Sequence, residues 1–345
     1  EVILVDLDMP GMDGIEFIGH IAQERLAKSI AVVSAMDPSL LHTVQVMAQA
    51  SGLRVLGAVE KPLSPGKLTH LLSLYEEEPD PSGNPVHVSV TLDQVREALA
   101  NGDIFPHFQP QAEFSNGKIV GVEALARWQL PDGRMVPPVS FVPMIESAGL
   151  IDDLTTHMLV ESCRWYARWK SAGLDLRVSV NVSASNLTGP EVADRYEKIL
   201  REHGMPPEDM ILEITESSVM SDTARGLGML ARLRLKGFGL SVDDFGTGYS
   251  SLSQLSQIPF TELKIDQGFV GGSPNQARKR AVIETSLDLA RKLDLQVVAE
   301  GVETMAEWQL LAQLGCDFAQ GYLISPAVAG DKLLDAIQQW RSTRH

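Results

Sequence analysis

Short apolar runs alternate with amphipathic helical patterns along most of this chain. The longer helical patterns include 157–173 and 279–293, and they separate runs rich in β-branched residues. Such alternation is typical of β/α units around a parallel sheet, and about eight strands suggest closure into a barrel. We expect strands at 105–111, 119–126, 176–184, 210–216, 237–244, 260–266, 295–303 and 318–322.

The first two of these strands are joined by only seven residues, 112–118, with the sequence AEFSNGK. This connection is too short for a crossover helix and contains turn residues, which predicts a hairpin. One strand should therefore run antiparallel to the others. The predicted fold class is α/β, with a (β/α)8 TIM-like barrel over 88–345.

A smaller domain is expected before the barrel. Runs at 1–7, 31–35 and 53–60 have the composition of buried strands, and 39–50 has a helical pattern. Residues 76–87 (EEEPDPSGNPVH) are acidic and rich in Pro and Gly, so they are interpreted as a linker. The expected boundaries are therefore 1–75 for the first domain, 76–87 for the linker and 88–345 for the barrel.

Composition and charge narrow the function. The net charge of −16 and the lack of a basic stripe make a nucleic-acid duplex an unlikely partner. Cys163 and Cys316 lie far apart, without metal-ligand spacing, and are interpreted as buried, reduced thiols of a cytoplasmic protein. There is no run of about 18 apolar residues, and no signal peptide, so we expect no membrane span.

Polar side chains occur at the ends of seven of these runs, where the active site of a β/α barrel lies. Carboxylates predominate among them, and Lys264 is the only basic group. Such a cluster would repel itself unless it held cations. Oxygen ligands without a His or Cys pattern favour Mg²⁺ or Mn²⁺, so we predict a metal-dependent enzyme. The side chains are Glu123, Asn181, Glu213, Glu216, Asp243, Asp244, Lys264, Asp266, Glu300, Glu303 and Gln320.

The N-terminal runs resemble the two-component receiver domain, a doubly wound, flavodoxin-like fold. Three motifs carry the resemblance: VDLDMPGMDG at 5–14, VVSA at 32–35 and EKP at 60–62. The resemblance implies phosphorylation of Asp6, with Ser34 as the switch hydroxyl, Lys61 as the partner lysine and a histidine kinase as the phosphate source. Because the chain begins inside an apolar run, we expect the first receiver strand, its helix and the second strand to be lacking, and with them the acidic pair that binds the Mg²⁺ needed for phosphorylation.

The region 88–345 resembles the EAL family of bacterial cyclic-di-GMP phosphodiesterases. The motifs occur in order across the whole region: FQPQ (108–111), EAL with Arg127-Trp128 (123–128), NVS (181–183), EITE (213–216), DDFGTGYSSL (243–252), LKID (263–266), AEGVE (299–303) and AQGY (319–322). The resemblance implies a site for two metal ions, Mg²⁺ or Mn²⁺, and inhibition by Ca²⁺. It also implies a homodimer formed through the barrel.

Roles for individual residues follow from the same resemblance. It assigns the first metal to Glu123, Asn181, Glu213 and Asp243, and the second metal or the attacking water to Asp243, Asp244, Asp266 and Glu300. Lys264 would orient the water or neutralise charge. Glu300 is the family's candidate base, and we expect it to share that role with the metals.

Substrate contacts are implied for Gln109, Leu125, Arg127, Gln320 and Pro326, with Arg127 on a phosphate. The loop after Asp244 should shape the second metal site and a dimer interface, anchored by Glu216 and Glu303. Glu303 is otherwise interpreted as a helix-start carboxylate. The family usually has a basic residue before the proline, where this chain has Ser325, so we expect altered affinity rather than loss of chemistry.

Two functions remain open at this point. The first is hydrolysis of cyclic di-GMP to linear pGpG, regulated by the receiver domain. The alternative is a catalytically inactive module that binds cyclic di-GMP or a partner. Inactive members typically lose metal ligands, the lysine or the loop aspartates. All of these positions are unaltered here, which favours the enzyme.

Overall fold

The computed structural model contains two compact units, Glu1–His87 and Val88–His345. The residues described are 2–7, 9, 12–24, 26–27, 29–34, 44, 47–48, 53–60, 90–183, 186–187, 189, 191–215, 223–246, 255 and 257–343. The expected linker, 76–87, lies outside them.

The first unit is built on a parallel three-stranded sheet in the order β1-β2-β3. Its elements are β1 (Val2–Asp6), α1 (Gly14–Glu24), β2 (Ser29–Ser34) and β3 (Arg54–Glu60). Helix α1 packs Ile18 and Ile21 into a core with Val5, Ile30 and Val32, all of them buried. The three apolar runs of this region therefore form strands, as predicted.

Eight strands of the second unit form a closed barrel, as predicted. Strands β4 and β12 pair, and β4 also pairs with β5, which closes the ring. The strands are β4 (Ile104–Glu113), β5 (Ile119–Gln129), β7 (Arg177–Asn181), β8 (Met210–Thr215), β9 (Gly239–Phe245), β10 (Glu262–Ile265), β11 (Gln296–Ala299) and β12 (Phe318–Gln320).

Strand β4 runs antiparallel to both of its barrel neighbours, β5 and β12, whereas the other barrel strands pair in parallel. The prediction of one antiparallel strand is confirmed. Two further strands, β6 (Met135–Val136) and β13 (Val328–Ala329), extend the sheet beside β5 and β4. Each has two residues, too few to show a pattern in the sequence.

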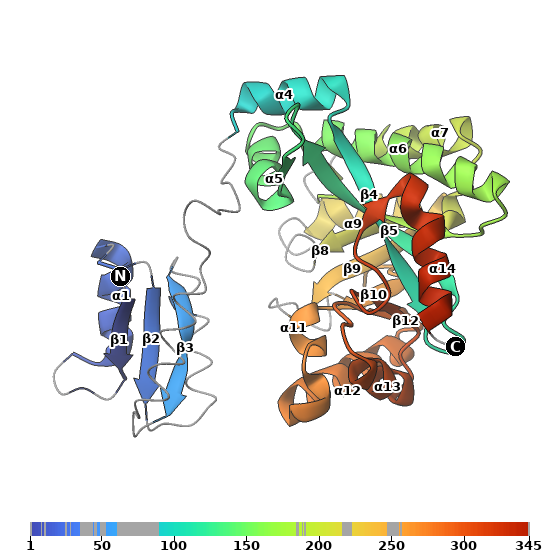
Figure 1. The fold of residues 1–345 in the computed structure, drawn as a ribbon. Helices are drawn as coiled ribbons and strands as arrows, with labels where there is room; N and C mark the ends of the chain where they lie inside the picture. Colours follow the sequence, from blue (N-terminus) through green and yellow to red (C-terminus); the bar gives the residue numbers. More distant parts are fainter. Residues whose placement is uncertain are drawn as a thin grey trace. The chain divides into compact units, whose positions relative to one another are not determined.

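Helices surround the barrel strands on the outside (Figure 1). Both helical patterns singled out in the sequence form helices, α6 and α12. The helices of this unit are α4 (Leu92–Asn101), α5 (Pro138–Ser147), α6 (Ile151–Ser171), α7 (Glu191–Glu202), α9 (Thr223–Leu235), α11 (Gln267–Val270), α12 (Ala277–Lys292), α13 (Met305–Leu314) and α14 (Leu333–Thr343).

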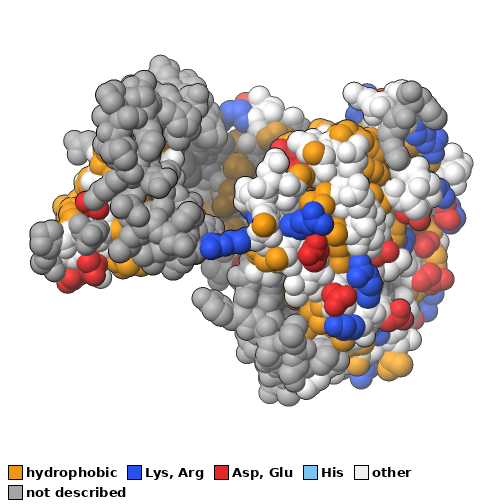
Figure 2. Space-filling view, turned by 90° about the horizontal axis from the view of Figure 1, so that it is seen from below, with side chains coloured by type: hydrophobic (Ala, Val, Ile, Leu, Met, Phe, Trp, Pro, Cys, Tyr) orange, Lys and Arg blue, Asp and Glu red, His pale blue; other side chains and the backbone are white. Residues whose placement is uncertain are grey.

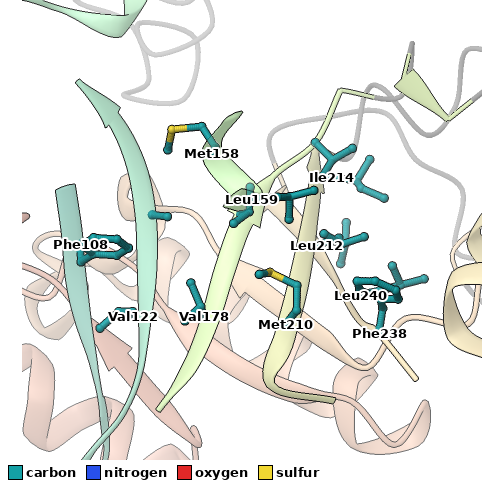
Figure 3. Close-up of a cluster of buried hydrophobic side chains, with 14 of the residues drawn as sticks. Phe108, Val122, Met158, Leu159, Val178, Met210, Leu212, Ile214, Phe238 and Leu240 are labelled. Carbon is teal, nitrogen blue, oxygen red and sulfur yellow. The ribbon is translucent and has the colours of Figure 1, made fainter. Parts of the chain in front are cut away.

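Alternation along the strands separates an apolar outer face from a polar inner face. Val122, Val178, Leu212 and Leu240 share the outer face and are buried under the helices. Figure 3 shows these side chains beside Met158 of α6 and other apolar groups. The intervening residues point into the barrel. The main core thus lies between sheet and helices, while polar groups share the barrel interior with a few apolar ones, such as Ile211 and Val298.

An aromatic group joins α6 to the first barrel strand. Trp169 is buried, meets Phe108 edge-on at 4.7 Å between ring centroids, and donates its indole N–H to the Gly330 carbonyl at 3.1 Å. Trp165 stacks beside Trp169 at 6.0 Å. Both tryptophans therefore take part in the packing of α6 against β4.

The two cysteines are free and buried, as predicted. Burial raises the pKa of both thiols, Cys163 and Cys316, to about 12. They are therefore packing groups with little thiolate character at neutral pH.

Acidic and basic side chains are interspersed on the face of the barrel unit seen in Figure 2. Several form surface pairs, such as Arg280 with Glu284 at 2.8 Å on α12. Such exposed pairs contribute little to stability. Within the part of the chain that the structure describes, no helix is long and apolar enough to cross a membrane.

Candidate functional site

The inward-facing residues at the ends of the barrel strands converge on one buried lysine, Lys264. This side chain comes from β10 and is fully buried. Its ammonium lies 3.0 Å from Glu123 Oε2 on β5, 2.7 Å from Glu213 Oε2 on β8 and 2.7 Å from Glu300 Oε1 after β11. A fourth carboxylate oxygen, Asp243 Oδ1, lies 3.5 Å away. Five strand ends thus contribute to one charge cluster.

Amide side chains surround Glu123 and hold it in place. Asn181 donates its Nδ2 hydrogen to Glu123 Oε1 at 2.8 Å, and Gln320 donates from Nε2 to Glu123 Oε2 at 2.6 Å. The same nitrogen of Gln320 lies 3.0 Å from Gln109 Oε1, while Gln111 donates to Gln320 Oε1 at 3.0 Å. The antiparallel strand β4 therefore supplies two glutamines that orient Gln320 of β12, which in turn holds the site's central carboxylate.

Two carboxylates at the end of β9 extend the cluster toward Glu300. Asp243, Asp244 and Glu300 each offer an oxygen, and these three oxygens lie within 4.8 Å of one another. Asp244 has a φ of 55°, a left-handed conformation that Asp tolerates better than most residues. This backbone conformation makes the side chains of the two consecutive aspartates point in different directions. The Asp244 N–H donates to Asp243 Oδ1 at 3.0 Å.

Charge crowding shifts the pKa values of this cluster in opposite directions. Burial would raise the pKa of Glu123, but Lys264 and the hydrogen bonds from Gln320 and Asn181 outweigh it and lower that pKa to about 2. Burial and nearby carboxylates raise the pKa of Glu300 to about 8 despite its contact with Lys264.

Burial and the charge of Glu123 likewise raise the pKa of Glu213, although Lys264 opposes this shift. Burial and the charge of Asp243 raise the pKa of Asp244. One ammonium thus stabilises one carboxylate fully and leaves the others short of positive charge.

A cavity of about 470 Å³ opens directly above this cluster. Glu123, Asn181, Asp243, Glu300 and Gln320 line it, and the cluster is therefore accessible from one side. A second cavity of about 400 Å³, mainly apolar, is lined by side chains that include Arg127, Val142 and Met158. Leu125 and Asn181 line both cavities. Both volumes fall in the range of small-molecule sites.

Most of the residues singled out in the sequence meet at these cavities. Gln109 and Gln320 line the first, Arg127 the second and Leu125 both. The Arg127 guanidinium is half-buried and donates to the Ala126 carbonyl at 2.9 Å. Burial lowers its pKa, against the charges of Tyr322 and Glu123, and it remains a cation at neutral pH.

Other singled-out residues lie at the edge of the site. The Asp266 carboxylate accepts from the Gly268 N–H at 2.9 Å as the N-cap of α11. Glu303 is exposed at the cavity rim, and Pro326 is also exposed. Ser325 is buried, and its carbonyl accepts from Gln109 Nε2 at 3.3 Å. The position where the family usually has a basic residue thus supports a glutamine of the cavity wall.

The remaining assignments fall elsewhere. Asp6 ends β1 and Ser34 ends β2, both in the first unit. Lys61, Glu216 and most of the loop after Asp244 lie outside the described residues.

One carboxylate near the site was missed in the sequence. Glu307 is buried and accepts from the N–H groups of Gly272, Glu303 and Thr304 at 2.8–3.0 Å. It forms a capping box with Thr304 at the start of α13. The Thr304-x-x-Glu307 spacing is the sequence signal that could have identified it. Glu307, rather than the side chain of Glu303, holds this turn after β11.

The residues present fit divalent cations. Asp243, Asp244 and Glu300 form a cluster of hard oxygen donors, and Glu213 Oε1 is buried without a hydrogen-bond partner among the described residues. Burial and the neighbouring carboxylates raise the pKa values of Asp244, Glu213 and Glu300, and a bound cation would oppose this rise. Carboxylate and amide oxygens of this kind suit Mg²⁺ or Mn²⁺.

Comparison with known proteins agrees with this geometry. The closed β/α barrel and the acidic site at its strand ends define the class of protein to which this chain belongs. Residues 92–327 match the EAL domain family. Cyclic di-GMP phosphodiesterase RocR of Pseudomonas aeruginosa is 33% identical over 337 residues, 97% of this chain and 86% of that protein. The chain therefore belongs to the EAL family.

Two further comparisons concern MucR. The bifunctional diguanylate cyclase/cyclic di-GMP phosphodiesterase MucR of Pseudomonas aeruginosa is 38% identical over 71% of this chain and 36% of its own length. A solved structure of the MucR phosphodiesterase in complex with c-di-GMP superposes with a TM-score of 0.67 and 38% identity. That match covers 70% of this chain and 98% of the solved one.

Replacing Lys264 tests the charge balance of the cluster. In the presence of EDTA, Lys264→Met should lower the free energy of unfolding by about 3–5 kcal/mol, because it leaves buried carboxylates without their cation. Trp fluorescence during urea unfolding reports on the barrel alone, since all five tryptophans lie in residues 128–340.

Lys198→Met is the matched control for this substitution. Lys198 is 65% exposed on α7, so its loss should change stability by less than about 0.5 kcal/mol. Equal stability of Lys264→Met and Lys198→Met would show that the carboxylates around Lys264 do not depend on its charge.

Proposed function

We propose that this protein hydrolyses cyclic di-GMP to linear pGpG with Mg²⁺ or Mn²⁺. The observation that carries the proposal is the acidic cluster around Lys264, which lies under an open cavity at the strand ends of an EAL barrel. Relatives named as cyclic di-GMP phosphodiesterases, and a related domain solved with c-di-GMP, support the substrate.

Binding of an anionic diester at an acidic site needs local positive charge. The two adjoining cavities could accept different parts of a dinucleotide, since they share Leu125 and Asn181 along their common wall. Arg127 would bind a phosphate through its fixed fork of donors. Gln109 and Gln320 present amide groups to the first cavity and would orient the ring by hydrogen bonds.

The reaction forms one bond and breaks one. Water attacks one phosphorus, the bond to a ribose 3′-oxygen breaks, and a proton reaches that oxygen. When bound, divalent cations supply Lewis-acid stabilisation of the anionic phosphoryl group. The first-metal residues would be Glu123, Asn181, Glu213 and Asp243.

The second set would be Asp243, Asp244, Asp266 and Glu300. Of these, Asp266 already caps α11 through one oxygen, so it would act from the edge of the site.

Lys264 and Glu300 would move or hold protons. The Lys264 ammonium lies 2.7 Å from Glu300 and would stabilise the negative charge that develops on phosphate oxygens. A carboxylate with a raised pKa is a suitable acceptor for the proton of the attacking water. Because Glu300 also belongs to the acidic cluster, we propose that it shares this task with the cations.

The N-terminal unit would regulate this activity as a receiver-type domain. The alignment with RocR covers 97% of this chain, so it extends into this unit. Asp6 lies at the end of the first described parallel strand and Ser34 at the end of its neighbour, as in the resemblance noted from the sequence. We further propose a histidine kinase as the phosphate source, and a homodimer through the barrel that sedimentation velocity would test.

Product analysis tests the main proposal. Purified full chain with cyclic di-GMP and Mg²⁺ or Mn²⁺ should yield linear pGpG on chromatography. EDTA should abolish the product, and Ca²⁺ should inhibit. Intact nucleotide in every reaction, with binding detected by calorimetry, would favour the inactive binding module. A different diester cleaved in its place would move the protein to another substrate class.

Asp244→Asn tests the site within that reaction. The substitution keeps the shape of the side chain and a residue type that tolerates the left-handed backbone. We expect kcat to fall roughly 100-fold or more, because a group of the metal cluster loses its charge. Asp335→Asn, an exposed aspartate in the first turn of α14, should leave kcat nearly unchanged. A small loss in Asp244→Asn would remove Asp244 from the proposed machinery.

Phosphate transfer tests the regulatory proposal. Incubation with acetyl phosphate should add one phosphate to a chain that carries the complete receiver domain, detected by intact mass, and Asp6→Asn should abolish it. Asp13→Asn is the matched control, since Asp13 is an exposed aspartate whose Oδ1 caps the start of α1 at Glu16 N. Equal labelling of both variants would reject Asp6 as the acceptor.

A further inference from the structure

Two segments that carry site carboxylates leave the sheet at neighbouring strands. The β10 segment, residues 266–272, begins with Asp266 and contains α11. The β11 segment, residues 300–304, begins with Glu300. Strands β10 and β11 pair in parallel, so both segments start at the same end of the barrel, where the active sites of such barrels lie. The position of Glu300 relative to Asp266 therefore depends on how the two segments are held against each other.

The near ends of the two segments meet through the backbone. The Glu300 N–H donates to the Ile265 carbonyl at 3.0 Å. Gly301 has a φ of 65°, and a Cβ atom at this position would lie 2.4 Å from the Cβ of Gln267. Such a close approach leaves no room for a side chain at Gly301. The β11 segment thus packs directly on the β10 segment at this point.

The far ends of the two segments meet at one side chain, Glu307 of α13. Its Oε1 accepts from the N–H of Gly272, the last residue of the β10 segment, at 2.8 Å. Its Oε2 accepts from the N–H groups of Glu303 and Thr304, which end the β11 segment, at 3.0 and 2.9 Å. One carboxylate therefore bridges both segments, with a different oxygen on each.

Glu307 makes a strong bridge because it is buried and charged. Its exposed fraction is only 4%. Burial alone would raise the pKa of Glu307, but the N–H donors outweigh it and lower that pKa. The side chain is therefore ionised at neutral pH, and both of its oxygens act as acceptors. Hydrogen bonds to an ionised acceptor are about twice as strong as those between neutral groups.

Helix capping explains only part of this arrangement. A capping box at the start of α13 requires that Glu307 accept from the N–H of Thr304, the N-cap residue of the same helix. It does not require the bond to Gly272, which belongs to a different segment. This additional bond joins the two segments at the end away from their packed glycine.

We propose that Glu307 is a positioning residue that sets Glu300 and Asp266 relative to each other through the two segments. This role rests on the proposed function, in which both carboxylates serve the cations. Glu307 is not among the described residues that line the cavity above the cluster, so it acts through the backbone and not by contact with the substrate.

Two substitutions of Glu307 in the full chain test this role, with Mn²⁺ alone as the probe. Glu307→Ala removes the bridge. Glu307→Asp keeps the charge and both oxygens, but its side chain is one methylene shorter and cannot reach both segments. Titration calorimetry should show that the Kd for Mn²⁺ rises roughly 10-fold or more in Glu307→Ala, because groups behind metal ligands have effects of this size. In Glu307→Asp it should rise by a smaller factor.

Gln94→Ala is the matched control. Gln94 forms the equivalent capping box at the start of α4, where its Oε1 accepts from the Thr91 N–H at 2.8 Å. No residue of α4, which is described along its whole length, lines either cavity. In EDTA, Gln94→Ala and Glu307→Ala should both lower the melting temperature, followed by tryptophan fluorescence. Only the Glu307 variants should change the Kd for Mn²⁺.

The possible outcomes separate this inference from the proposed function. If the wild type binds Mn²⁺ and both Glu307 variants bind it equally well, Glu307 is only a helix cap and the inference is wrong. A raised Kd in Glu307→Ala, with the wild-type Kd in Glu307→Asp, would assign the effect to charge and also reject positioning. An equal rise in Gln94→Ala would reject it too.

Two further outcomes also decide the question. If Glu307→Ala does not fold, Glu307→Asp alone gives the answer: a raised Kd supports positioning, and the wild-type Kd rejects it. A wild type that binds no Mn²⁺ would overturn the proposed function, and the role of Glu307 with it.

Discussion

The burial of one ammonium among several carboxylates is the constraint on which the site depends. Lys264 is inaccessible to water and touches oxygens of Glu123, Glu213 and Glu300 within 3.0 Å. A lysine buried alone would lose its charge, whereas here the surrounding carboxylates raise its pKa despite burial. The same contacts fix the ends of four strands relative to one another. The charge balance of the site and the geometry of the barrel therefore depend on the same contacts.

The closed barrel places most of its apolar packing and its polar contacts on opposite faces of the sheet. Alternation sends Val122, Val178 and Leu212 outward under the helices and sends their neighbours inward. An ordinary barrel fills its interior with branched apolar side chains. This interior instead contains many charged and amide groups between the cavity and Arg177, with a few apolar side chains such as Ile211 and Val298 among them. The stability of the unit must come mainly from the layer between strands and helices, while the interior is given over to the site.

Much of this arrangement could be predicted from the sequence, because each barrel strand carries its polar group at the end that faces the cavity. The eight strands and the antiparallel hairpin between β4 and β5 are confirmed. The sequence does not reveal which of these side chains touch one another. The contact of Lys264 with four carboxylates could be seen only in the three-dimensional structure, because it depends on the register of the strands. The inward-facing Glu262 of β10 and Arg177 of β7 were missed because they lie at the start of their strands, where a polar residue usually indicates the protein surface. Strands β6 and β13 form only by pairing with β5 and β4, so their own sequences could not predict them.

The charge deficit of the cluster links folding to the proposed chemistry. One ammonium lowers the pKa of Glu123, yet the pKa values of Glu213, Asp244 and Glu300 stay above their ordinary range. Cations that bind the ionised carboxylates would remove this deficit, and by linkage they would stabilise the barrel as they load the site. An anionic diester would then meet a site whose excess negative charge is already offset. In the proposed function, the same deficit that disfavours full ionisation of the unloaded barrel would favour the binding of divalent cations.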